Sequence, residues 1–138
     1  MSAKKSSTKA KTSAKAMPKP VPGKFCWNEL ITRNPSKAKK FYGSLFGWKA
    51  AAFGQGMAYT LFKNGTDNAG GMMQCPAHGG HSHWLPYVIV KDVDASLKKA
   101  KKMGAEICME PFDIPTVGRI AVFTDPQGAA IGMITPKM

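Results

Sequence analysis

The sequence predicts an α+β fold in which two βαβββ modules pair into a cup-shaped sheet. The first reason is that a strand, a helix and three further strands are recognisable twice, beginning at Phe25 and again at Trp84. The second is that each helical segment carries apolar residues three and four positions apart, which is typical of a helix covering a sheet. The third is that one module alone leaves a sheet face bare, so two must pair to enclose a core.

The chain of 138 residues divides into an arm and one domain. Residues 1–23 are rich in Lys, lack acids and aromatic residues, and end in a Pro-x-Pro-x-Pro linker. They cannot bury enough apolar surface to fold, so we expect a disordered arm. Residues 24–138 form the domain, with module one at 24–76 and module two at 83–136.

Most of the positive charge belongs to the arm. Up to Lys24 the chain holds seven of its 20 Lys and Arg and none of its eight acids. The net charge of +12 is therefore about +7 on this stretch and about +5 on the remainder. We expect such an arm either to contact nucleic acid weakly, without sequence preference, or to act as a solubilising tail.

The sequence also indicates the compartment. No apolar run is long enough for a transmembrane helix, and the N-terminus lacks the apolar core of a signal peptide. Cys26, Cys75 and Cys108 are odd in number and widely spaced, which favours reduced thiols. We therefore expect a cytoplasmic protein without a membrane partner.

In module one, Phe25–Thr32 alternates in polarity and predicts a strand. Asn34 and Pro35 then supply a helix start, and Gly47 a helix end. Between them lies an apolar face made of Ala38, Phe41, Tyr42, Leu45 and Phe46. Three short strands follow at 48–53, 58–63 and 70–75, separated by glycine-containing turn signals.

Module two repeats this order. A strand is predicted at 84–90, and Asp92 or Asp94 caps a helix that ends at Gly104. Its apolar positions are Val93, Leu97, Ala100 and Met103. Strands follow at 106–110, 119–124 and 130–134, with a tight turn at 125–128 between the last two.

Through these segments the chain resembles the vicinal-oxygen-chelate superfamily, which contains glyoxalase I, the bleomycin- and fosfomycin-resistance proteins and the extradiol dioxygenases. The resemblance extends over residues 24–136. It rests on an ordered set of motifs: WNEL at 27–30, AKKFYGSLFGW at 38–48, GGMM at 70–73, WLPY at 84–87, VKDVD at 90–94, GR at 118–119 and DPQGA at 125–129. Within the superfamily the chain is most similar to small glyoxalase-like proteins of unassigned activity.

The resemblance implies a cup whose floor binds a divalent metal through His, Gln or Glu from the first and last strands of each module. The metal would hold two substrate oxygens and stabilise an oxyanion. The matching positions here are Trp27, Leu85, Gly132 and the run Gly71, Met72 and Met73, none of which offers a nitrogen or oxygen side-chain ligand. The sequence therefore predicts no metal cofactor, with a divalent ion as the alternative, and an apolar cup suited to a small organic molecule.

Glu29 is the candidate catalytic residue. It lies two positions from Trp27, on the same strand face, where apolar neighbours would raise its pKa. The alternative is a carboxylate paired with a Lys or Arg. The predicted ligand-binding residues are Trp27, Met73, His83, Leu85, Tyr87 and Arg119, and Trp48 and Trp84 belong either to the pocket or to the core.

Two polar features stay open at this stage. Arg119 would either meet an anionic substrate group or form a surface ion pair. The loop 75–83, with Cys75, His78, His81 and His83, is either a zinc, nickel or copper site or a solvated connector between the modules.

Three functions are consistent with these residues. The preferred one is a glyoxalase-like protein that binds a small organic molecule and acts as a lyase or isomerase without the usual metal, with Glu29 transferring a proton and a homodimer as an assembly to test. The second is a non-catalytic module that sequesters a ligand, as the drug-resistance relatives do. The third is a vestigial cup that the Lys-rich arm tethers to nucleic acid.

Overall fold

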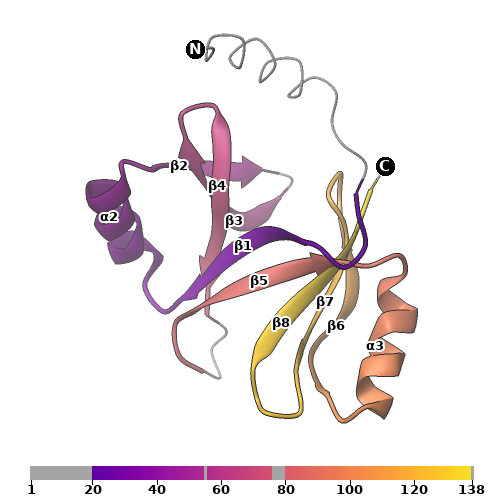
Figure 1. Cartoon of the computed structure of the whole chain (residues 1–138). Coiled ribbons are helices and arrows are strands. Elements are labelled where there is room, and N and C mark those ends of the chain that lie inside the picture. Colours follow the sequence, from indigo (N-terminus) through magenta and orange to yellow (C-terminus); the bar gives the residue numbers. More distant parts are fainter. Residues whose placement is uncertain (1–19, 55, 76–79, 138) are drawn as a thin grey trace, which may run out of the picture.

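The computed structural model describes residues 20–54, 56–75 and 80–137 and has the predicted architecture (Figure 1). Two βαβββ modules share one eight-stranded sheet with the strand order β2-β3-β4-β1-β5-β8-β7-β6. The first 19 residues of the predicted arm, and His78 of the His-rich loop, lie outside the described residues. Within the described part, no helix is long and apolar enough to span a bilayer.

Module one consists of β1 (Phe25–Thr32), α2 (Pro35–Phe46), β2 (Lys49–Gly54), β3 (Met57–Asn64) and β4 (Asp67–Gln74). The helix starts where the sequence predicts, because the Asn34 side chain accepts a hydrogen bond from the Lys37 backbone N–H at 3.0 Å. It ends at Gly47, which adopts the left-handed conformation that terminates many helices.

Module two consists of β5 (His83–Ile89), α3 (Val93–Lys102), β6 (Glu106–Ile114), β7 (Gly118–Thr124) and β8 (Ala130–Pro136). Asp92 is the helix cap, since its side chain accepts from the Ala95 N–H at 3.1 Å. Strand β6 continues past Pro111, beyond the predicted end at 110. It is an edge strand, where a proline need not interrupt hydrogen bonding to a neighbour.

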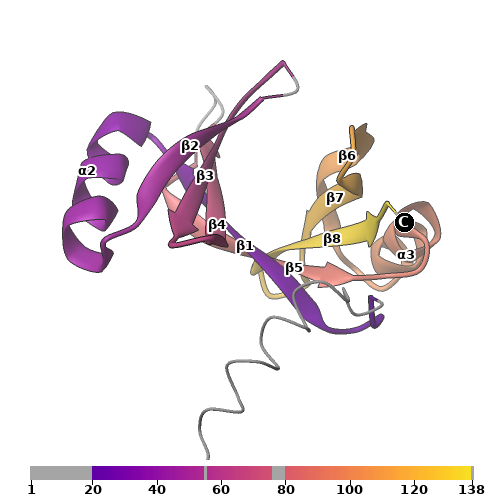
Figure 2. The ribbon, with the colours of Figure 1, turned by 90° about the horizontal axis from the view of Figure 1, so that it is seen from above.

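The modules join edge to edge through their first strands. Strands β1 and β5 pair antiparallel, and each also pairs in parallel with the last strand of its own module. Viewed from above, β2, β3 and β4 form one wall and β6, β7 and β8 the other, while α2 and α3 lie outside (Figure 2). The concave face of this single curled sheet is the predicted cup.

In the part of the chain that the structure describes, buried apolar side chains form three clusters on the two faces of the sheet. The cluster on the concave face is built around Leu85, Tyr87, Ile120 and Ile134. The two clusters on the convex face lie under the helices: Leu30, Ala38, Phe62 and Met72 under α2, and Val93, Leu97, Ala121 and Met133 under α3. Each helix therefore stabilises the sheet from outside and leaves the inside free.

The predicted apolar face of α2 is only partly buried. Ala38 is buried and Tyr42 half-buried, but Phe41, Leu45 and Phe46 keep 59%, 59% and 54% of their surface exposed. The Tyr42 ring fills the space beneath the helix, where it packs on aromatic rings of the convex face: Trp48, Phe62 and Trp84.

On α3 the prediction is also wrong at its last position. Met103 is 69% exposed because it lies at the C-cap, beyond the last helical residue.

Phe62→Ala is expected to lower the free energy of unfolding by about 3–5 kcal/mol, because the ring is 1% exposed and its removal leaves a cavity. Phe41→Ala is the matched control. Its ring also contacts Tyr42, but from the solvent side, so the expected loss is under about 1 kcal/mol. Urea unfolding of both variants measures the difference; equal losses would contradict the described packing.

Candidate functional site

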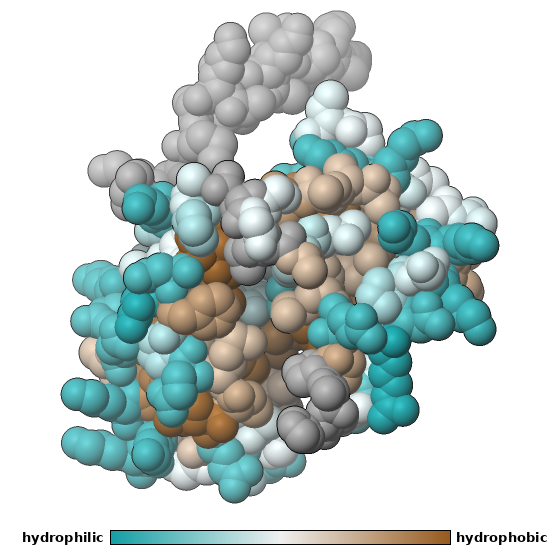
Figure 3. Space-filling view, turned by 180° about the vertical axis from the view of Figure 1, so that it is seen from behind, coloured by the Kyte–Doolittle hydropathy of each residue, from teal (hydrophilic) through white to brown (hydrophobic). Residues whose placement is uncertain are grey.

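The concave face encloses a cavity of about 350 Å³. Its walls come from both modules and are mostly apolar: Phe53 and Leu61 from module one, and Ile114, Val117, Ile120, Ile134 and Pro136 from module two. Polar groups come mainly from the floor and from module one: Cys26, Trp27, Glu29, Tyr59, Asn68 and Tyr87. Figure 3 looks into this hollow, where apolar residues gather at the centre and hydrophilic ones surround it.

Polar side chains lie side by side on the floor of the cavity. The Tyr87 hydroxyl donates to Glu29 Oε1 at 2.9 Å, and the Tyr59 hydroxyl lies near enough to the same carboxyl group to lower its pKa. The Trp27 indole N–H in turn donates to the Tyr59 oxygen at 3.1 Å. Among the described residues, the carboxyl group of Glu29, only 5% exposed, is therefore paired with a neutral hydroxyl and forms no ion pair with a Lys or Arg.

Burial dominates the protonation of Glu29. It raises the pKa of the carboxyl group above its usual 4.5, while the hydroxyls of Tyr59 and Tyr87 and the nearby His83 pull the pKa down in part. Burial and the charge of Glu29 also raise the pKa of both tyrosines. The two hydroxyls consequently stay protonated and act as hydrogen-bond donors at physiological pH.

Two glycines make room for the tyrosine rings. Gly71 pairs with Glu29 across β1 and β4, and Gly132 pairs with Tyr87 across β5 and β8, so the two glycines occupy corresponding positions in the two modules. A Cβ atom at Gly71 would collide with the Tyr59 hydroxyl, and one at Gly132 would collide with the Tyr87 ring. Any larger residue there would displace the floor of the cavity.

The donors at this site do not fit the metal of the superfamily. Among the described residues no group of three His, Cys, Asp or Glu side chains could hold an ion. Tyrosine side chains fill the space beside Gly71 and Gly132, the last-strand positions that would supply ligands. Among the described residues that line the cavity, Glu29 alone contributes a carboxylate. We therefore derive no step of the chemistry through a metal.

The structure brings together three of the predicted site residues, Trp27, Glu29 and Tyr87. Leu85 lies on the same face but is 3% exposed within the core, and Met73 packs against that core without lining the cavity. His83 is opposite Ile31 further along the strand pair, where its Nδ1 donates to the His81 carbonyl oxygen at 2.8 Å.

Arg119 lies outside the cavity. Successive residues of a strand point to opposite faces, and Ile120 is the one that faces inward. The Arg119 guanidinium forms ion pairs with Asp94 at 3.0 Å and with Asp113 at 3.3 Å. Of the two roles that the sequence allowed for Arg119, the structure shows the surface ion pair and not a contact with the cavity.

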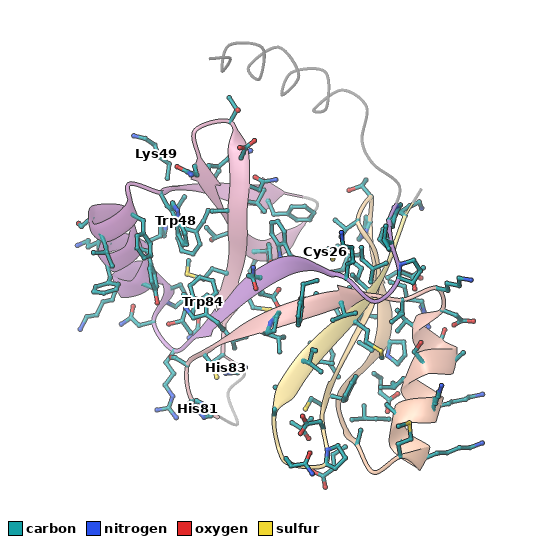
Figure 4. All side chains as sticks on the ribbon, in the orientation of Figure 1. Cys26, Trp48, Lys49, His81, His83 and Trp84 are labelled. Carbon is teal, nitrogen blue, oxygen red and sulfur yellow. The ribbon has the colours of Figure 1, made fainter. Side chains whose placement is uncertain are left out.

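The same alternation places Trp84 on the convex side, next to Leu85 on the concave side. Trp84 packs there with Trp48, and both lie in the half of the molecule that carries α2 (Figure 4). Neither tryptophan lines the cavity: Trp48 packs against the core beneath α2, whereas Trp84 keeps 38% of its surface exposed on the convex face.

The sequence reasoning missed Tyr59, Asn68 and the far wall formed by β6 and β7. Tyr59 and Leu61 alternate within the predicted strand at 58–63, which could have indicated that they share a face. The contact between Tyr59 and Glu29 depends on the pairing of three strands, which the alternation does not specify.

Glu29→Gln is expected to change the pH dependence of stability. Because the pKa of Glu29 is raised in the folded state, its contribution to folding is fully present below about pH 4.5 and is lost as the pH rises through the folded-state pKa. Glu29→Gln lacks this loss. Its free energy of unfolding, relative to that of the wild type, should therefore increase between about pH 4.5 and the folded-state pKa of Glu29 and stay constant at higher pH. Urea unfolding at several pH values tests this, and parallel curves would contradict the raised pKa.

The family and the relatives that match this sequence agree with the fold described above. The sequence model of the Glyoxalase/Bleomycin resistance protein/Dioxygenase superfamily matches residues 25–133. CFP32 of Mycobacterium tuberculosis, which carries the provisional name glyoxylase, is 40% identical over 116 residues, covering 83% of this chain and 44% of CFP32. The anthracycline biosynthesis protein DnrV of Streptomyces peucetius is 31% identical over 129 residues, covering 82% of this chain and 47% of DnrV. The chain thus spans less than half the length of these relatives.

Solved structures show the same fold at low identity. Methylmalonyl-CoA epimerase from Mycobacterium tuberculosis superposes with a TM-score of 0.57 at 14% identity, covering 88% of this chain and 93% of the epimerase. The Mn(II)-bound glyoxalase from Novosphingobium aromaticivorans gives 0.56 at 16% identity, covering 83% of this chain and 39% of that protein. The match of the family model over residues 25–133 and the 40% identity to CFP32 show that the chain belongs to the glyoxalase/bleomycin resistance/dioxygenase superfamily.

Proposed function

We propose that this protein binds a neutral, largely apolar organic molecule in the cup and that Glu29 moves a proton on it, in an isomerase-type reaction. The observation that carries this proposal is the position of Glu29: a carboxyl group, 5% exposed, at the floor of an apolar cavity. A buried carboxylate with a raised pKa is a stronger base than one in water, which suits it to proton transfer.

The cavity favours an uncharged ligand. Its volume of about 350 Å³ lies at the lower end of the range for small-molecule sites. The described residues that line it include no Lys, Arg or His, so nothing in this lining compensates a negative charge on the ligand. An anion would also meet the carboxylate of Glu29, which supports a neutral molecule with a largely apolar body.

The comparisons support the same class. The fold neighbours include an epimerase, which is an isomerase by name. DnrV is named for anthracycline biosynthesis. These names belong to other proteins; the first agrees with an isomerase-type reaction and the second with an organic small molecule as the ligand.

Binding without turnover is the second candidate function. The hydrogen bond from Tyr87 and the nearby hydroxyl of Tyr59 favour it, because they stabilise the carboxylate and so weaken it as a base. In this case Glu29 would hold a donor group of the ligand and the protein would sequester it.

The location of binding is tested with 2-tetralone, a neutral bicyclic ketone, by equilibrium dialysis. Leu61→Trp fills the cavity from its wall and is expected to weaken binding at least tenfold, about 1.4 kcal/mol. Leu45→Trp is the matched control, since it adds the same side chain on the exposed face of α2. Undiminished binding to the Leu61 variant would place the ligand elsewhere.

Catalysis is tested by the exchange of 2-tetralone C–H protons for deuterium in D₂O, followed by NMR. The wild type should accelerate this exchange, and Glu29→Gln should slow it by about 10²–10⁴-fold while binding stays within a few-fold. If the wild type binds 2-tetralone without accelerating exchange, the sequestering function is supported and the catalytic one contradicted.

A further inference from the structure

We infer that the hydroxyls of Tyr59 and Tyr87 form an oxyanion-binding pair, and that the substrate is a carbonyl compound whose oxygen faces this pair while Glu29 takes a proton from the adjacent carbon. This inference rests on the proposed function, because it assigns the substrate class of the same cavity. The pair would do with two O–H donors what the superfamily does with a metal ion.

The two hydroxyls converge from different parts of the sheet. Tyr59 comes from β3 in module one, Tyr87 from β5 in module two, and both line the cavity. Tyr87 donates to the carboxyl group of Glu29 at 2.9 Å, and the Tyr59 hydroxyl lies close to the same group. Two hydroxyl donors beside one negatively charged group form an arrangement that can bind an oxyanion.

The pair is also held in place before any ligand binds. The Tyr59 oxygen accepts the indole N–H of Trp27 at 3.1 Å, which fixes the position of the oxygen and leaves its single hydrogen free to be donated to another group. The ring of Tyr87 and the hydroxyl of Tyr59 occupy space that only glycine at 132 and at 71 leaves open. Donors that are already oriented need no reorganisation when charge develops.

The reaction step balances with these groups alone. Glu29 takes the proton, the electron pair of the broken C–H bond forms a carbon–carbon double bond, and the carbonyl π pair moves onto oxygen as an enolate. The negative charge thereby leaves Glu29 and appears on the substrate oxygen. Neutral Glu29 attracts the two hydroxyl hydrogens less than the carboxylate did, so they can donate to the enolate. Return of the proton to carbon restores the carbonyl group.

The raised pKa values of both tyrosines agree with this role. Burial and the charge of Glu29 keep Tyr59 and Tyr87 protonated, so that each offers a hydrogen throughout the reaction. A tyrosine that ionised easily would repel an enolate instead.

The test uses 4-nitrophenolate, whose charged oxygen on a flat ring imitates an enolate, and 4-nitroanisole as its uncharged counterpart. Both are measured on Glu29→Gln, which imitates the state after Glu29 has taken the proton. This variant should bind nitrophenolate at least tenfold more tightly than the wild type. Adding Tyr59→Phe or Tyr87→Phe should weaken nitrophenolate binding by about tenfold or more, and nitroanisole binding by less than about twofold.

Tyr42→Phe in the same background is the matched control. The Tyr42 oxygen accepts the indole N–H of Trp84 at 3.2 Å, as that of Tyr59 does from Trp27, but it lies on the convex face. Nitrophenolate binding should not change in this variant.

The outcomes separate the two proposals. If nitroanisole binds and neither Tyr59→Phe nor Tyr87→Phe weakens nitrophenolate, the oxyanion pair is wrong while the binding function stands. If neither compound binds, the cavity does not take flat aromatic molecules, and both proposals are contradicted.

Discussion

The hydrogen bond between the Tyr87 hydroxyl and Glu29 joins the two modules at the floor of the cup. Glu29 belongs to the first strand of module one and Tyr87 to the first strand of module two, and the two strands pair antiparallel. Both side chains are almost fully buried, at 5% and 3% exposure. An unpaired carboxylate here would be costly, so the partner hydroxyls are a condition for placing a charge in this apolar site.

The rest of the concave face follows from this constraint. The rings that satisfy Glu29 need space, and Gly71 and Gly132 provide it at the strand positions where the superfamily places metal ligands. A metal site and this tyrosine site therefore exclude one another at the same place in the fold. The chain keeps the architecture of the superfamily, but the floor of its cup carries hydroxyl donors and one carboxylate at the place where the superfamily holds a metal ion.

Much of the fold was predictable because its signals are local. Asn34, Pro35 and Gly47 fix the ends of α2 through capping, and the alternation of Phe25–Thr32 predicts β1 with its observed bounds. The same alternation correctly put Trp27 and Glu29 on one face. Partner choice was not predictable, since Tyr59 reaches Glu29 only after β3, β4 and β1 have paired. Likewise, the exposure of Phe41 depends on how Tyr42 fills the space beneath the helix.

The central claim, that Tyr87 supports a buried Glu29, is tested most directly by a double-mutant cycle on the free energy of unfolding. The variants are Tyr87→Phe, Glu29→Met and the two combined. If the hydrogen bond is buried as described, each single change leaves a polar group without its partner, and the double variant should lose less than the two together by about 1–3 kcal/mol. Additive losses would contradict the claim.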